Sequence, residues 1–152
     1  MQTQSWPDAL RPPKPRHIEQ LLADFWTELA GLGDLVGRDE QLLAAASTAR
    51  LRRIVLELML GLNGIAWPEG TRHLNSYLGE SQRAAIQKTL AAPALHGDTW
   101  VGQAVALVVI YRWYAPQLVE RFQLVYPAEL ESTTLSTLQE SLPDWPLNIT
   151  TD

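Results

Sequence analysis

The 152-residue chain contains no cysteine. Without thiols it can build neither a disulfide framework nor a thiolate metal site, and it has no cysteine nucleophile. At this length a compact fold buries about two-thirds of the surface of its unfolded chain, so the protein needs no cross-link to be stable. The absence of cysteine is compatible with a reducing compartment, and we expect a cytoplasmic protein.

Positive charge is also scarce, since 12 basic residues stand against 17 acidic ones and the formal net charge is -5. This balance argues against a broad nucleic-acid interface, which needs clustered positive charge. The longest apolar run, Ala104 to Tyr111, has eight residues, whereas a membrane-spanning helix needs about twenty. The N-terminus lacks a basic region followed by an apolar stretch, so we expect no secretory signal. Neither nucleic acid nor a membrane is expected as a partner.

Motifs for metal and cofactor binding are missing as well. The three histidines, His17, His73 and His96, lie far apart, and none has a His, Asp or Glu at position i+4, whereas metal-binding helices place their ligands one turn apart. No glycine-rich phosphate loop is present, and the string closest to a nucleophile elbow, residues 79–82, lacks the second glycine. The sequence therefore predicts no metal, no cofactor and no catalytic residue.

The start of the chain alternates prolines with basic side chains. Pro7, Pro12, Pro13 and Pro15 stand around Arg11 and Lys14. Each proline removes a backbone donor and restricts the residue before it, so this stretch cannot be helical. We expect residues 1–15 to form an extended lead-in, or equally a linker between domains. A helical domain then covers residues 16–142, and residues 143–152 form a tail with Trp145 folded back.

Hydrophobic residues recur at helical spacing in two long stretches. The first consists of Ile18, Leu21, Leu22, Phe25, Trp26, Leu29 and Leu32, and the second runs from Leu42 and Leu43 to Leu62. We predict a helix at about 16–30, ended by Gly31 and Gly33, because the backbone freedom of glycine suits a helix stop. A second, central helix is predicted from Asp39 to Leu62, with acidic residues at its start, where the helix dipole favours them.

The rest of the chain shows four shorter helical patterns, at 71–78, 81–91, 98–115 and 128–142. Ser81 or its neighbour, and Asp98, are the expected caps of the second and third of these. Residues 108–110, Val-Val-Ile, would also suit a buried strand, but the uninterrupted pattern favours a helix. Pro116 should kink or restart that helix, because it removes one backbone hydrogen bond. The predicted fold class is all-α, a bundle of five to six helices that is partly up-and-down.

Two groups of side chains admit both a structural and a functional interpretation. Arg50, Arg52 and Arg53 form the only basic cluster, and they either extend into solvent, with Arg53 paired to Glu57, or form an anion site. Residues 111–114, Tyr-Arg-Trp-Tyr, either fill the core or stack on a planar ligand. In both cases we favour the structural interpretation, because it is the commoner role of such residues.

The most unusual segment is the loop after the central helix. It carries an amide, an indole, a guanidinium and an imidazole in one short span, on Asn63, Trp67, Arg72 and His73. Loops held by a rigid scaffold often carry binding groups, and we predict a small-molecule pocket lined by these four residues. Trp67 would supply an apolar wall, and Arg72 a guanidinium that can donate two parallel hydrogen bonds. His73 would supply a group that titrates near neutrality. Alternatively, Trp67 closes the end of the bundle and Arg72 pairs with Glu69 or Glu80.

Several short motifs follow one another in an order that is familiar from one family. They are the Pro-rich lead-in, Phe25-Trp26, Gly37-Arg38-Asp39-Glu40, Ala49-Arg50-Leu51-Arg52, Leu62-Asn63, the stretch from Trp67 to Leu74, and Tyr126-Pro127-Ala128-Glu129-Leu130. This order resembles the C-terminal helical domain of the aminoglycoside- and lincosamide-type nucleotidyltransferases of the polymerase-β-like superfamily. The resemblance covers about residues 14–142. In that family the helical domain closes over the catalytic domain and shapes the acceptor pocket.

The sequence departs from that family in its catalytic motif. Members carry, upstream, a Gly-Ser turn and two metal-binding aspartates separated by one residue, but this sequence contains neither Gly-Ser nor Asp-x-Asp. Nucleotidyl transfer needs carboxylates that hold a divalent metal against the triphosphate. The resemblance therefore implies a non-catalytic substrate-binding or regulatory module. Its partner would be a nucleotidyltransferase catalytic domain that is separate or has been lost.

A second interpretation is a stand-alone helical interaction protein, either a homodimeric bundle or the partner of a small nucleotidyltransferase toxin. The predicted helices carry many large apolar residues, including Phe25, Trp26, Trp100 and Trp113, and some of these could face a partner. An independent hydrolase or RNA-cleaving enzyme has the least support, because no acid, base and nucleophile can be aligned from the sequence.

Overall fold

The structure is a computed structural model that describes residues 6–90, 97–146 and 149. In these residues there are five α-helices, one 3-10 helix and no strand. The elements are α1 (Pro15–Gly37), α2 (Gln41–Leu62), η1 (Leu74–Tyr77), α3 (Glu80–Lys88), α4 (Gly97–Phe122) and α5 (Ala128–Ser141). The predicted all-α bundle is thereby confirmed. His96 and the side chain of Asp98, an expected cap, lie outside the described residues.

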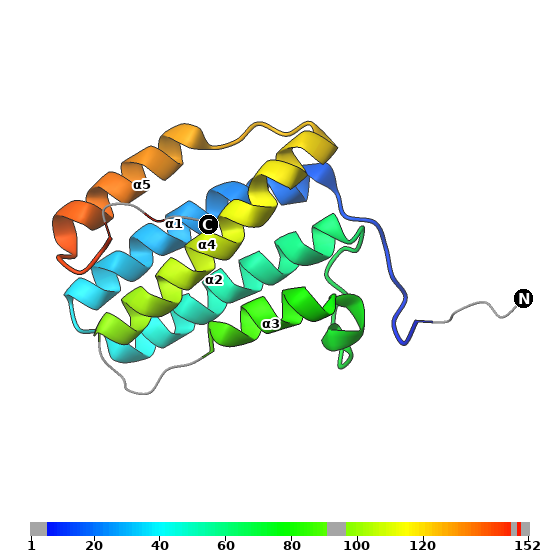
Figure 1. The fold of residues 1–152 in the computed structure, drawn as a ribbon, viewed down its shortest axis with the longest axis horizontal. Helices are drawn as coiled ribbons and strands as arrows, with labels where there is room; N and C mark the ends of the chain where they lie inside the picture. Colours follow the sequence, from blue (N-terminus) through cyan, green and yellow to red (C-terminus); the bar gives the residue numbers. More distant parts are fainter. Residues whose placement is uncertain (1–5, 91–96, 147–148, 150–152) are drawn as a thin grey trace, which may run out of the picture.

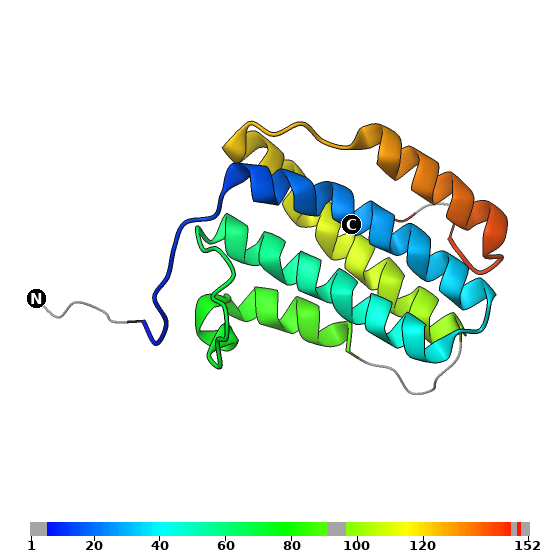
Figure 2. The same cartoon turned by 180° about the vertical axis from the view of Figure 1, so that it is seen from behind.

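Four helices, α5, α1, α2 and α3, lie side by side in that order, and α4 crosses one face of the row (Figure 1). Seen from behind, α1 and α2 stand in front of α4 (Figure 2). The packing of α4 is mainly against α2, with further contacts to α1 and α3. The end of α2, η1 and the start of α3 come together at the end of the bundle where the chain enters from its N-terminus.

The first helix is longer than the sequence predicted. It runs from Pro15 to Gly37 and passes through both Gly31 and Gly33, so the predicted stop at about residue 30 is wrong. Gly33 is buried against α5, where an added Cβ would overlap the side chain of Leu138. A glycine is therefore needed there for the close approach of the two helices. The chain instead reverses at residues 38–40, where Asp39 adopts a positive φ of 58°.

The later boundaries also differ in part from the predicted ones. The helix α4 continues through Pro116 to Phe122, so there is neither a restart at the proline nor a strand at 108–110. The pattern at 71–78 forms only the short 3-10 turn η1. The cap predicted at Ser81 is wrong because α3 begins at Glu80. The start of α3 is closed by Gln82, whose Oε1 accepts a hydrogen bond of 2.8 Å from the backbone N–H of Gly79.

A cluster of three aromatic rings from α1 and α4 fills the core. Phe25 and Tyr111 stack with centroids 4.1 Å apart, and Trp26 meets Tyr111 edge-on at 5.2 Å. The Tyr111 hydroxyl donates to the carbonyl oxygen of Leu22 at 2.8 Å and accepts from Trp26 Nε1 at 3.1 Å. Its complete burial raises the pKa of Tyr111 well above the ordinary value of 10. Within residues 111–114, Tyr111 is therefore a core residue, which is the interpretation that the sequence analysis favoured.

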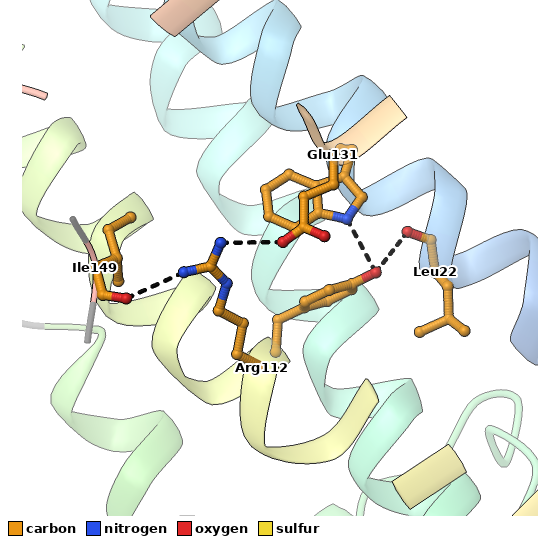
Figure 3. A network of polar contacts seen from close by, with 6 residues as sticks. Leu22, Arg112, Glu131 and Ile149 are labelled. Carbon is orange, nitrogen blue, oxygen red and sulfur yellow. Dashed lines mark hydrogen bonds and ion pairs between the residues drawn. The ribbon is translucent and has the colours of Figure 1, made fainter. Parts of the chain in front are cut away.

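Arg112 ties the tail and α5 to α4. Its guanidinium donates to the Glu131 carboxylate and to the carbonyl oxygen of Ile149, each at 3.0 Å (Figure 3). Trp145 is 4% exposed, which confirms that the tail folds back with this residue inside. Through these two contacts Arg112 holds Ile149 and α5 against α4.

Leu42 and Leu43, which belong to the apolar pattern of the predicted central helix, lie outside the core. Leu42 and Leu43 are 86% and 54% exposed, because the inner face of the first turns of α2 is formed by Ala44, Ser47 and Thr48. Small residues at these positions let α2 pack closely on its neighbours. In residues 6–90, 97–146 and 149, no helix has the length and hydrophobicity needed to cross a membrane.

Candidate functional site

Residues 6–14 of the Pro-rich lead-in precede α1 and contain no helix, and they are fastened to the loop between α2 and α3. The carboxylate of Asp8 accepts hydrogen bonds from the hydroxyls of Thr71 at 2.7 Å and Tyr77 at 2.5 Å. These two bonds lower the pKa of Asp8, with Tyr77 the larger cause. The backbone N–H of Ala66 donates to the carbonyl oxygen of Arg11 at 2.8 Å. We call residues 6–14 the strap, since they bind the loop and η1 into one unit.

Two amide side chains join the end of α2 to the start of α3. Asn63 Nδ2 donates to Gln82 Oε1 at 2.8 Å, and Gln82 Nε2 donates back to Asn63 Oδ1 at 3.1 Å. Asn63 Nδ2 also donates to the carbonyl oxygen of Tyr77 at 2.9 Å. Because each amide holds the other in one orientation, both present fixed polar atoms to their surroundings.

These amides line an open groove of about 690 Å³ between the end of α2, η1, the start of α3 and α4. Four aromatic side chains also line it, and the remaining lining is amide, hydroxyl and apolar. The lining residues are Trp6, Leu62, Asn63, Ile65, Ser76, Tyr77, Leu78, Gly79, Ser81, Gln82, Trp113, Tyr114 and Gln117. None of them carries a charge at neutral pH. We call this hollow the amide–aromatic groove.

Trp67 lies apart from that groove, in a second hollow of about 290 Å³ between the strap and the loop. The ring of Trp67 is covered on one side by Arg53, whose Cζ is 3.5 Å from the ring centroid. Arg53 also pairs with Glu57 at 3.6 Å, which confirms the predicted i+4 pair, and approaches Glu69 at 4.0 Å. One face of the indole is therefore already occupied by a cation of the protein itself.

Arg72 and His73 are exposed and line neither of these two hollows. Within the described residues Arg72 forms no ion pair with Glu69 or Glu80, the structural alternative considered for it. The backbone N–H of His73 donates to the hydroxyl of Thr71 at 3.0 Å. Of the four predicted ligand-binding residues, the structure thus brings only Asn63 into the amide–aromatic groove. A ligand role for the other three stays a prediction from the sequence.

Sequence reasoning missed most of the groove. Gln82 and Tyr77 gave no signal, because their role depends on contacts with Asn63 that only the folded chain creates. Trp113 and Tyr114 were part of the aromatic group for which ligand stacking was the less favoured interpretation. Trp6 lies in the strap, and its ring meets that of Tyr77 at 5.7 Å with an interplanar angle of 60°. The position of Trp6 beside Pro7 was the only sequence feature that pointed to this part of the groove.

The basic cluster on α2 is used internally. Arg50 donates to Glu28 at 2.9 Å, as an exposed ion pair. Arg52 does not extend into solvent, which corrects the favoured interpretation: it is half-buried and donates to the hydroxyl and carbonyl oxygens of Thr89 and to Gln103 Oε1, each at 2.8 Å. Burial lowers the pKa of Arg52. Its partners are all neutral acceptors, so Arg52 joins α2 to the end of α3 and to α4.

Comparison of the chain with protein-family models, with curated proteins and with solved structures finds no match. The functional argument therefore depends on the chemistry of the groove and on the motifs in the sequence.

Proposed function

We propose that the chain is a non-catalytic helical binding module, which holds a small ligand in the amide–aromatic groove and acts with a nucleotidyltransferase catalytic domain. The observation that carries the proposal is the reciprocal pair of hydrogen bonds between Asn63 and Gln82 on the wall of the groove. Fixed polar groups beside aromatic walls are typical of ligand sites. The order of motifs that resembles the helical domain of nucleotidyltransferases supports the kind of partner.

The composition of the groove favours binding over catalysis. Its polar side chains are amides and hydroxyls, whereas general acid–base catalysis uses groups that titrate near the working pH. Among the described residues, no three His, Asp or Glu side chains are placed to hold a metal ion together. Nucleotidyl transfer requires such carboxylates. On this proposal the catalytic groups belong to the partner domain.

Two assays test the proposal. The purified chain, given ATP, magnesium ions and a panel of small acceptors, should transfer no nucleotidyl group. A catalytic nucleotidyltransferase domain from a neighbouring reading frame should gain activity when the chain is added. The variant Trp113→Ala should reduce that gain, because Trp113 lines the groove, whereas the control Val125→Ala alters another exposed apolar residue, outside the groove. Transfer by the chain alone, or equal activation by both variants, would contradict the proposal.

A second candidate function is a stand-alone interaction protein that forms a homodimer. It is favoured by the exposure of two consecutive leucines, Leu42 and Leu43, at the start of α2. The other large apolar residues considered for a partner are accounted for in part, since Phe25, Trp26 and Trp100 are buried. Light scattering separates the two candidates. The binding module should be a monomer without its catalytic partner, whereas a dimer that dissociates in the double variant Leu42→Glu, Leu43→Glu would support the second candidate.

A further inference from the structure

We infer that the amide–aromatic groove takes an uncharged sugar ring. The inference rests on the proposed function, because it names the ligand class of the same groove. Three properties of the lining carry it: the hydrogen-bonding capacity left on the amide pair, the aromatic walls and the absence of charge.

The amide pair has one donor and one acceptor left for a ligand. Asn63 Nδ2 donates one hydrogen to the carbonyl oxygen of Tyr77 and the other to Gln82 Oε1. Gln82 Oε1 accepts a second hydrogen bond from the backbone N–H of Gly79. Gln82 Nε2 donates only one of its two hydrogens, to Asn63 Oδ1. One hydrogen on Gln82 Nε2 and one lone pair on Asn63 Oδ1 are therefore without a partner among the described residues. Neighbouring sugar hydroxyls, each of which donates and accepts, complement such a pair.

The aromatic side chains supply the apolar walls that a sugar ring needs. Trp6 and Tyr77 meet at an angle and form a corner of the groove, and Trp113 and Tyr114 approach from α4. A pyranose has two C–H faces and a rim of hydroxyls, so it can place its faces on aromatic rings and its rim toward the amides. The volume of about 690 Å³ lies within the range of small-ligand sites, roughly 300–1,000 Å³.

The lack of charge separates neutral sugars from amino sugars and acidic sugars. No Lys, Arg, His, Asp or Glu is among the lining residues, so a charged substituent would lose water without gaining an ionic partner. The start of α3 offers little to an anion, because the N–H of Gly79 already donates to Gln82 and Glu80 occupies the first turn. Asp8 is not among the lining residues, and its Oδ2 accepts hydrogen bonds from the hydroxyls of Thr71 and Tyr77.

A set of three matched ligands tests the inference on the full chain. The probes are methyl glucopyranoside, the methyl glycoside of glucosamine and the methyl glycoside of glucuronic acid, which differ in charge. Amide chemical shifts in a nuclear magnetic resonance titration should move for residues of the groove with the neutral probe. Both charged probes should bind about tenfold more weakly, because their charge is desolvated without compensation. Equal or tighter binding of either charged probe would overturn the inference.

Variants show whether the binding is at the groove. Trp113→Ala removes an aromatic wall, and Gln82→Glu keeps the shape of the side chain while replacing the donating Nε2 by an oxygen. Either should weaken binding of the neutral glycoside at least about tenfold, whereas Val125→Ala, at an exposed residue outside the groove, should bind as wild type does. Shifts confined to other surfaces, or no shift with any neutral probe, would also overturn the inference. Those outcomes would leave the proposed function standing, because activation of the catalytic domain is measured independently of these sugars.

Discussion

Arg53 on α2 places its guanidinium carbon 3.5 Å from the centre of the Trp67 ring, in the loop that follows the same helix. The arginine is thereby held between an aromatic face and two carboxylates, those of Glu57 and Glu69. The sequence analysis predicted that Arg72 and Trp67 line one pocket, but the cation that contacts the Trp67 ring is Arg53 of the preceding helix. This contact fastens the loop to α2, and neither residue lines the amide–aromatic groove.

We predict that Arg53→Ala lowers the free energy of unfolding by about 1 kcal/mol, the sum of a partly exposed cation–π contact and a weak ion pair. Arg72→Ala is the matched control, because it removes an exposed arginine of the neighbouring loop that has no ion pair among the described residues. It should change the free energy by less than about 0.5 kcal/mol. Urea unfolding followed by circular dichroism measures both values. Equal effects of the two substitutions would contradict the assignment of the contact.

Gly31 and Gly33 form a second matched pair. Both lie inside α1, where alanine is favoured over glycine by about 0.5–1 kcal/mol. An added Cβ at Gly31 meets nothing within 4 Å, so Gly31→Ala should stabilise the protein by about that amount. At Gly33 the Cβ would overlap the buried Leu138 side chain. Gly33→Ala should therefore be destabilising, as overpacking commonly costs about 1–3 kcal/mol.

Thermal unfolding of both alanine variants checks this prediction, with the wild type in the same buffer. The midpoint should rise for the variant at residue 31 and fall for the variant at residue 33. A rise of the midpoint for both variants would mean that α5 can move away from α1 without loss of stability. The conclusion that Gly33 serves the close approach of these helices would then be wrong.

The same two glycines show how far the sequence can predict this fold. The spacing of apolar residues predicted the helical class and most of the helices, because an amphipathic pattern depends on local periodicity alone. It could not tell a glycine that ends a helix from one that admits a neighbouring helix. The difference lies in Leu138, which is more than a hundred positions away in the sequence.

The candidate site was predictable to a smaller extent for the same reason. Asn63 was identified from its place at the end of a helix in an unusual loop. Its partner Gln82 is 19 positions away, and Asp8 is 69 positions from Tyr77. Side-chain hydrogen bonds of this kind have no periodicity in the sequence, and they appear only when the strap, η1 and α3 are brought to one end of the bundle.

Attachment of the strap should depend on the charge of Asp8. Its pKa lies below the ordinary aspartate value of 3.8, because the ionised carboxylate accepts hydrogen bonds from Tyr77 and Thr71. A lowered folded-state pKa means that the stabilisation is present above the ordinary value and is lost as the pH falls through the folded value. We predict that the indole resonance of Trp6 keeps its folded position from neutral pH down to about pH 4 and shifts toward that of a free tryptophan below it.

Asp8→Asn is the companion experiment. The amide keeps the size of the side chain but lacks the negative charge, so the indole of Trp6 should be partly released already at neutral pH, and its resonance should no longer depend on pH in the acid range. The resonance of Trp26, which is completely buried, serves as the internal control and should stay in place. A Trp6 resonance that is identical in wild type and variant at neutral pH would show that Asp8 does not hold the strap.

Alkaline pH tests Tyr111, which is buried, and Tyr126, which is partly buried. Burial is the main cause that raises the pKa of Tyr126 from 10 to about 12, and Tyr111 is shifted in the same direction. Between these two pH values an unfolded tyrosine loses its proton while the folded one keeps it, so the unfolded state binds fewer protons. The stabilisation is therefore complete below pH 10 and is lost as the pH rises toward 12. We predict that the urea midpoint falls across this range and that Tyr126→Phe makes the fall shallower. The ultraviolet absorbance of tyrosinate in the native protein should show delayed ionisation that Tyr126→Phe partly removes. A titration at the ordinary tyrosine value for all four residues would contradict the partial burial of Tyr126 beside Tyr111.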